Sequence, residues 1–204
     1  MHFFIIIILF LIFSDGLVSK AYSSSLFTKD CSKEKKYHLI KTICDGDTVS
    51  LGECTGKQKD LRIRFLGIDS FETKQNNFGK DGKRFLTELL LNKEICIESD
   101  VQEKDKYGRT LGYVFINKPM KSESWDPGFM DARDQIFVNE ELLKKGYAIL
   151  YNSSTNKKYI DRLKKAQIFA RQNMLGIWKE KDYIIETPAQ WRQKHKNNYP
   201  PSVK

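Results

Sequence analysis

Residues 61–73 read Leu-Arg-Ile-Arg-Phe-Leu-Gly-Ile-Asp-Ser-Phe-Glu-Thr, and the rest of the chain is best understood from this stretch. Its first half alternates apolar residues with two arginines, which predicts a strand with one polar face. A core strand rarely carries two guanidinium groups on one face unless that face is open to solvent or to an anion. After Gly67 the chain presents Asp69, Ser70 and Glu72 within four residues. An arginine followed by two carboxylates at a strand end suits phosphate chemistry, and it equally suits a surface strand with a salt bridge.

Short strands are expected on both sides of this stretch. Residues 37–44 and 48–54 form two of them, joined at Asp45-Gly46-Asp47, where Asp-Gly indicates a tight turn. With the strand that carries Arg64, they make an antiparallel meander. Further strands are expected at residues 94–99, 109–116 and 135–138.

Helical periodicity marks three segments, at residues 82–92, 139–145 and 157–173. Residues 117–134 show no clear period and are expected to form a long loop. Strands with short turns and few helices favour an α+β, mainly β class. The predicted architecture is a five-stranded β-barrel of the OB type with about three packed helices.

Length and charge restrict the organisation of the chain. Its 204 residues, of which 40% are hydrophobic, can bury one sizeable core, so we expect one globular domain with tails. Thirty-five basic and 26 acidic residues give a net charge of +9. That charge favours a polyanionic partner such as nucleic acid or an acidic membrane surface, although a merely basic soluble protein would show it too.

The N-terminal residues indicate export. The unbroken apolar run at 3–13 is too short to span a bilayer comfortably, and Ser19-Lys20-Ala21 offers a cleavage site. We therefore expect a secreted, periplasmic or cell-envelope protein, with a retained membrane anchor as the alternative. The expected segments are a signal peptide at 1–21, a flexible leader at 22–35, the main domain at 36–180 and a partly ordered tail at 181–204.

Four cysteines, Cys31, Cys44, Cys54 and Cys96, form an even count. In an exported chain that count predicts two disulfides, and three pairings are possible. Buried free thiols are the alternative. The sequence shows no Cys-x-x-Cys pair or nearby histidine cluster that would support a zinc site.

Three stretches, taken together, resemble the staphylococcal nuclease (thermonuclease) family. They are Asp45-Gly46-Asp47-Thr48, residues 64–73 and Asp105-Lys106-Tyr107-Gly108-Arg109, in the family's order and at near-family spacing. Leu175-Gly176-Ile177-Trp178 extends the resemblance, which covers residues 36–178. The family fold is an OB-type barrel with three helices, which agrees with the elements expected above.

The resemblance implies a calcium site and a catalytic base. Asp47 and Asp69 match the carboxylates that bind Ca²⁺, and Ser70 matches a backbone carbonyl ligand of the same ion. Glu72 matches the general base that acts on the attacking water. Ca²⁺ prefers oxygen ligands in loose geometry, so this donor set suits it and leaves room for a phosphate oxygen.

The resemblance also implies how the substrate is held. Arg64 and Arg109 match the arginines that grip the scissile phosphate, and Lys106 and Tyr107 match residues beside the terminal phosphate of the nucleotide. Guanidinium groups suit this task because hydrolysis needs charge neutralisation as the phosphorane forms. Tyr151 lies next to the position of a base-stacking tyrosine, and packing is an equal alternative for it.

The implied function is an exported, Ca²⁺-dependent nuclease that cleaves the 5′ P–O bond of DNA and RNA, prefers single strands and leaves 3′-phosphates. No protein partner is implied, and a monomer is expected. Two alternatives stand beside it: a catalytically weakened OB-fold nucleic-acid-binding module and a membrane-tethered structural or adhesion protein. The family usually has Thr-Pro where this chain has Ser70-Phe71. Loss of that proline is expected to loosen the loop that aims Glu72.

Overall fold

The structure is a computed structural model of the chain. It describes residues 30–34, 36–55, 57, 61–117, 135–152, 155–179 and 186–196. The predicted signal peptide, most of the predicted leader and the body of the predicted loop at 117–134 lie outside the described residues. Within the described residues, no helix has the length and apolar character needed to cross a membrane.

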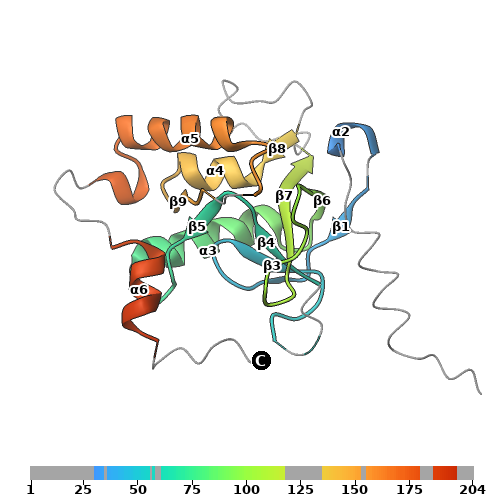
Figure 1. The fold of residues 1–204 in the computed structure, drawn as a ribbon, viewed down its shortest axis with the longest axis horizontal. Coiled ribbons are helices and arrows are strands. Elements are labelled where there is room, and N and C mark those ends of the chain that lie inside the picture. Colours follow the sequence, from blue (N-terminus) through green and yellow to red (C-terminus); the bar gives the residue numbers. More distant parts are fainter. Residues whose placement is uncertain are drawn as a thin grey trace, which may run out of the picture.

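One large sheet and one small sheet form the β part of the molecule (Figure 1). The order of the main path is β1-β6-β7-β4-β3-β2, and β8 pairs with β7 beside that path. These strands are β1 (His38–Leu39), β2 (Thr42–Ile43), β3 (Thr48–Ser50), β4 (Arg62–Phe65), β6 (Glu94–Glu98), β7 (Thr110–Asn117) and β8 (Gln135–Phe137). The small sheet pairs β5 (Ile68–Ser70) with β9 (Ala148–Leu150).

The predicted antiparallel meander is confirmed by the pairing of β2 with β3 and of β3 with β4. The sequence analysis did not foresee that β4 pairs in parallel with β7, with Arg64 opposite Leu111. It also missed β5 and β9 as separate strands. The parallel pairing places the 105–109 turn, just before β7, beside the strand that carries Arg64.

The observed class is mixed α+β, with more strands than the five expected. Within the described ranges, the two outer strands of the main path, β1 and β2, do not pair with each other. The pairings therefore do not close the sheet, and an OB-type barrel stays a prediction.

Helices cover the sheet and reach the ends of its strands (Figure 1). They are α2 (Cys31–Glu34), α3 (Asn77–Leu90), α4 (Val138–Lys144), α5 (Ile160–Gln172), the 3-10 helix η3 (Gly176–Lys179) and α6 (Pro188–Lys194). α4 and α5 lie against each other, and α4 also packs on β7. The predicted helices at 139–145 and 157–173 are confirmed, the first shifted by one residue to Val138–Lys144 and the second shortened to Ile160–Gln172.

The start of α3 was predicted wrongly, because the helix begins at Asn77 and not at residue 82. The side chain of Asn76 caps the helix by accepting a bond from the amide of Gly79. Residues 76–83 are polar and contain glycine, a composition typical of a loop, and were expected to form one. Gly79 is instead buried in the helix against the backbone of Phe71 and Glu72, where a Cβ would collide. This close contact places the first turns of α3 against the segment that contains Glu72.

The turn between β4 and β5 is held by a buried side chain from α4. Asn139 is fully buried, donates to the carbonyl of Leu66 at 2.8 Å and accepts from the amide of Val114 at 2.9 Å. Both ends of this amide are satisfied, so it ties the turn to β7. The turn that precedes Asp69 is therefore anchored to the core.

Two disulfides are present, as the cysteine count predicts, and they pair Cys31 with Cys96 and Cys44 with Cys54. The first fastens α2 to β6, so Cys31–Glu34 of the predicted leader form a short helix that is tied to the sheet. The second closes the hairpin that carries the Asp45–Asp47 turn. One bridge therefore ties the start of the described chain to the sheet, and the other stabilises an acidic turn.

Candidate active site

Arg64 lies at the centre of a cluster of charged side chains. Its Nη1 donates to the carbonyl oxygens of Phe65 and Ile68, each at 2.9 Å. Its Nη2 lies 2.9 Å from Oδ1 of Asp69 and 3.1 Å from Oδ2 of Asp47. One guanidinium therefore joins two carboxylates to the backbone between β4 and β5.

Asp47 comes from the turn between β2 and β3 and is 4% exposed. Its Oδ2 accepts from the backbone amide of Ser70 at 2.7 Å, and its Oδ1 accepts from the hydroxyl of Thr48 at 3.0 Å. Its own carbonyl accepts from the amide of Phe65 at 2.9 Å. The turn also packs closely on β5, because a Cβ at Gly46 would lie 2.9 Å from the Cβ of Ser70. Backbone and side chain together fix this carboxylate.

The two carboxylates beside Arg64 differ in their electrostatics. Burial by itself would raise the pKa of Asp47. The charge of Arg64 and the hydrogen bond from the amide of Ser70 outweigh burial, so the pKa of Asp47 is lowered. Burial raises the pKa of Asp69, and the nearby charge of Asp47 adds to that shift, against the opposing effect of Arg64. Asp47 is therefore the more firmly ionised of the two carboxylates.

Asp45, in the same turn, also has a pKa displaced from its ordinary value. Its Oδ1 accepts from the amide of Asp47 at 3.0 Å. Burial, and next the charge of Asp47, raise the pKa of Asp45 to about 7. Asp45 is therefore partly protonated near neutral pH, which limits the negative charge at this turn.

The donor set suits an oxygen-seeking cation. Among the described residues, no group of three or more His, Cys, Asp or Glu side chains is arranged as a metal cluster. Asp47 and Asp69 nevertheless converge on one guanidinium nitrogen, and both are almost fully buried. A small number of carboxylates completed by carbonyls and waters is a donor set that Ca²⁺ accepts. Asp47, Asp69 and Ser70 therefore fit the predicted site in chemistry, and their roles as ligands stay predictions.

Glu72 lies beside this pair and is held by an arginine from the far end of the chain. Oε1 of Glu72 is 2.9 Å from Nη1 of Arg192, and Oδ2 of Asp69 is 2.8 Å from Nη2 of the same side chain. Gln75 accepts from the amide of Glu72 and donates to the carbonyl of Glu186. Figure 1 shows α6 in red beside the segment that joins β5 to α3. The predicted base and one predicted metal ligand are thus bridged by α6.

Arg109 lies in a second, more exposed group. Its Nε is 2.7 Å from Oδ2 of Asp105, whose Oδ1 accepts from the amides of Tyr107 and Arg109. The cations of Lys106 and Arg109 lie 5.1 and 5.6 Å from the ring centre of Tyr107. These contacts all lie within the turn 105–109. The substrate contacts predicted for Lys106, Tyr107 and Arg109 stay predictions.

Tyr151 follows β9, at the end of the small sheet next to the β4–β5 turn. Its amide donates to the carbonyl of Gly67 at 3.0 Å, and its side chain is 55% exposed. A mostly exposed ring is available for stacking and adds little to the core. That exposure favours the base-stacking alternative over packing, but no contact in the structure tests it.

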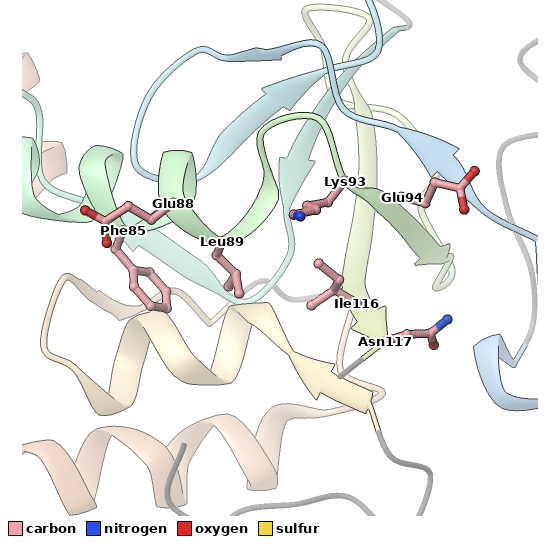
Figure 2. A pocket seen from close by; sticks show the side chains of 7 residues that line it. All are labelled: Phe85, Glu88, Leu89, Lys93, Glu94, Ile116 and Asn117. Carbon is pink, nitrogen blue, oxygen red and sulfur yellow. The ribbon is translucent and has the colours of Figure 1, made fainter. Parts of the chain in front are cut away.

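A pocket of about 480 Å³ lies away from the charged cluster, between α3 and the sheet (Figure 2). Its lining mixes apolar and charged side chains, namely Phe85, Glu88, Leu89, Lys93, Glu94, Ile116 and Asn117. None of the residues predicted for the site is among them. Its location gives no reason to move the candidate site from Arg64.

The sequence analysis missed Arg192. It expected a partly ordered tail at 181–204, whereas residues 188–194 form a helix that reaches Asp69 and Glu72. A signal for the helix was present, because Thr187-Pro188-Ala189-Gln190 forms a capping box with proline at the first turn. No local signal shows where such a helix docks, 120 residues from Glu72 in sequence.

Comparisons with known proteins agree with this geometry. Residues 62–180 match the family described as staphylococcal nuclease homologue. The chain is 35% identical to the thermonuclease of Staphylococcus hyicus over 152 residues, which cover 72% of this chain and 78% of that protein. It is 32% identical to the thermonuclease of Staphylococcus intermedius over 146 residues, covering 69% and 75%. It is 31% identical to endonuclease YncB of Bacillus subtilis over 147 residues, covering 69% and 60%.

The class of protein is therefore a nuclease, a phosphodiester hydrolase. The chain belongs to the staphylococcal nuclease family. The resemblance inferred from Asp45–Thr48, residues 64–73 and the 105–109 turn is confirmed at the level of the family.

Proposed function

We propose that the chain is an exported, Ca²⁺-dependent nuclease that hydrolyses phosphodiester bonds of DNA and RNA. The observation that carries the proposal is the cluster at Arg64, where one guanidinium holds two buried carboxylates next to Glu72. A site that only binds nucleic acid needs basic and stacking groups, and buried carboxylates would repel phosphate. Their presence beside an arginine favours catalysis over binding.

The proposed calcium site uses the carboxylates of Asp47 and Asp69 with the backbone carbonyl of Ser70. When bound, Ca²⁺ would neutralise charge on a phosphate oxygen and polarise the attacking water. Asp47 keeps its negative charge because Arg64 and the amide of Ser70 stabilise it. The chain thus supplies an ionised ligand before the metal arrives.

The proposed reaction adds water to phosphorus and breaks the 5′ P–O bond. Glu72 orients the water and accepts one of its protons, while the remaining O–H forms the new bond to phosphorus. A solvent water donates a proton to the departing 5′ oxygen, and Glu72 returns its proton to solvent. Arg64 and Arg109 contact the phosphate and stabilise the extra negative charge of the phosphorane. Product ends are then a 3′-phosphate and a 5′-hydroxyl.

Substrate contacts beyond the scissile phosphate are proposed for the exposed turn. Lys106 and Tyr107 lie there with Arg109, and Tyr151 offers a mostly exposed ring. Stacking on such rings needs unpaired bases, so we propose a preference for single-stranded DNA and RNA. We also propose a monomer with an OB-type barrel, secreted or held in the cell envelope after removal of residues 1–21.

The test is digestion of single-stranded DNA and of RNA by the exported chain, with Ca²⁺ and with a calcium chelator. The variants are Glu72→Gln and, as a matched control, Glu88→Gln, which removes an exposed carboxylate on α3. We expect cleavage only with Ca²⁺. Glu72→Gln should lower turnover by about 10²–10⁴-fold, the usual contribution of a general base, and keep nucleotide binding.

Other outcomes separate the alternatives. Tight binding of both nucleic acids without cleavage would favour the binding module. Cleavage that continues in the chelator would remove the calcium assignment. Equal turnover of the Glu72→Gln and Glu88→Gln variants would remove Glu72 from the role of base. N-terminal sequencing of the exported protein tests cleavage after Ala21, and an intact N-terminus would favour the anchor.

A further inference from the structure

α6 adds a second arginine to the carboxylate cluster, from beyond the residues that match the family. The match ends at residue 180, and Arg192 lies in α6 at 188–194. Its two terminal nitrogens are divided between Glu72, at 2.9 Å, and Asp69, at 2.8 Å. Two carboxylates that the proposed reaction needs are therefore engaged by one side chain.

The position of α6 is held by contacts independent of the arginine. The side chain of Gln75 donates to the carbonyl of Glu186 at 2.7 Å, which joins the segment after Glu72 to the start of α6. Thr187 and Gln190 form a capping box that fixes the first turn. Trp191, next to Arg192, is 8% exposed. Contacts other than those of the arginine therefore also hold the start of α6 beside the segment after Glu72.

The guanidinium of Arg192 neutralises the carboxylates of Asp69 and Glu72, as a bound metal cation would. Burial alone would lower the pKa of Arg192. The carboxylates of Asp69 and then Glu72 have a larger effect and raise it, so the guanidinium stays charged. A planar fork that contacts two carboxylates at once is a stronger arrangement than a single surface ion pair. Oδ2 of Asp69, which this fork occupies, is the oxygen that Arg64 leaves free, since Arg64 contacts Oδ1.

We infer that Arg192 is a tethered counter-cation that competes with Ca²⁺ for Asp69 and restrains Glu72 while the metal is absent. The inference rests on the calcium site proposed above. Ca²⁺ and the guanidinium of Arg192 cannot both contact Oδ2 of Asp69, because the two cations repel each other at that distance. Metal binding therefore requires Arg192 to leave Asp69. The apparent affinity for Ca²⁺ is then the intrinsic affinity multiplied by the fraction of molecules in which the contact is broken.

The test is direct calorimetric titration of Ca²⁺ into the full exported chain, without nucleic acid. The variant Arg192→Gln removes the charge from a side chain that is 41% exposed, so the fold should survive. The matched control Arg84→Gln removes a charge on α3, where Arg84 is 68% exposed and pairs with Asp81, three residues earlier. If the contact forms in about nine of ten molecules, Arg192→Gln should bind Ca²⁺ about ten-fold more tightly than the wild type. Arg84→Gln should change the affinity less than about two-fold, because exposed charges are screened.

A conservative variant distinguishes the contact of Arg192 with both carboxylates from a general effect of its positive charge on Ca²⁺ binding. Arg192→Lys keeps the charge but cannot divide a planar fork between two carboxylates, so its Ca²⁺ affinity should lie between those of the wild type and Arg192→Gln. An Arg192→Gln affinity equal to or weaker than that of the wild type would overturn the inference while leaving the nuclease proposal intact. If that variant instead lost nucleotide binding at unchanged Ca²⁺ affinity, Arg192 would be a phosphate-binding residue, and the competition would be wrong. A wild type that binds no Ca²⁺ at all would remove the proposed metal site itself.

Discussion

Arg64 and Arg109, the two arginines predicted to grip the phosphate, lie in very different surroundings. Arg64 contacts two carboxylates and two carbonyls, which come from the turn before β3 and from residues 65–69. Arg109 contacts Asp105, four residues away, and the ring of Tyr107. The Arg64 side chain is 15% exposed, and that of Arg109 is 26% exposed. One arginine is part of the tertiary structure, while the other belongs to a local turn.

The difference indicates how each arginine contributes to function. Removal of Arg64 would leave Asp47 and Asp69 buried and facing each other without their shared cation. Removal of Arg109 would leave Asp105 close to solvent, with its backbone contacts intact. Stability should therefore depend on Arg64, whereas Arg109 should matter almost only to catalysis.

The largest expected effect follows from Arg64→Ala. Breaking a buried ion pair by removing one partner costs about 3–5 kcal/mol in the free energy of unfolding. We expect a loss of that size in urea unfolding with a chelator present, together with the loss of nuclease turnover. The matched control is Arg62→Ala on the same strand, where Arg62 donates to the carbonyl of Cys54. The control should lose about 1 kcal/mol, and an equal loss in both variants would contradict the special place of Arg64.

The sequence was sufficient for the local elements around these arginines. Alternation in residues 61–65 and helical periodicity at 139–145 and 157–173 predicted a strand and two helices that the structure confirms. The Asp-Gly turn located Asp47, and the three motifs identified the family. These predictions succeeded because period, turn chemistry and motif spacing act over short distances along the chain.

Long-range contacts explain what the sequence did not reveal. The parallel pairing of β4 with β7 joins segments 47 residues apart, as in Ile63 opposite Thr110, and no local pattern encodes it. Four cysteines allowed three pairings, and only the fold selects one of them. Glycine at the start of α3 suggested a loop. Its real role is to let the helix approach the backbone of Phe71 and Glu72, and that contact cannot be read from the local sequence. Docking of α6 on Glu72 is of the same kind.

A smaller effect is expected for Arg109→Ala, and it should appear in the rate. Loss of one guanidinium that stabilises the transition state should lower turnover about a hundred-fold, equivalent to ~2.7 kcal/mol. The free energy of unfolding should fall by less than about 1 kcal/mol, because partly exposed ion pairs contribute little. Steady-state kinetics and urea unfolding on the same preparation check both expectations. Lys106→Ala is the control, and a rate loss as large as that of Arg109→Ala would contradict the assignment.

The smallest effect concerns Asp45, which tests whether burial and the charge of Asp47 oppose a further negative charge beside Arg64. Its pKa of about 7 in the fold lies above the ordinary 3.8, so the folded protein retains a proton that the unfolded chain releases. This contribution stabilises the fold at low pH and is lost as the pH rises towards 7. Between pH 5 and pH 8, wild-type stability should fall by about 2 kcal/mol more than that of Asp45→Asn, in a chelator.

Asp45→Asn is suitable for this comparison because an asparagine Oδ1 can still accept the bond from the amide of Asp47. Asp81→Asn is the matched control, since Asp81 lies in a surface pair with Arg84. Urea unfolding at the two pH values gives the measurement. If wild type, Asp45→Asn and Asp81→Asn share one pH dependence, burial and the charge of Asp47 do not oppose a further negative charge beside Arg64. The contrast between Arg64 and Arg109 would then depend on hydrogen bonding and burial alone, without a contribution from the titration of Asp45.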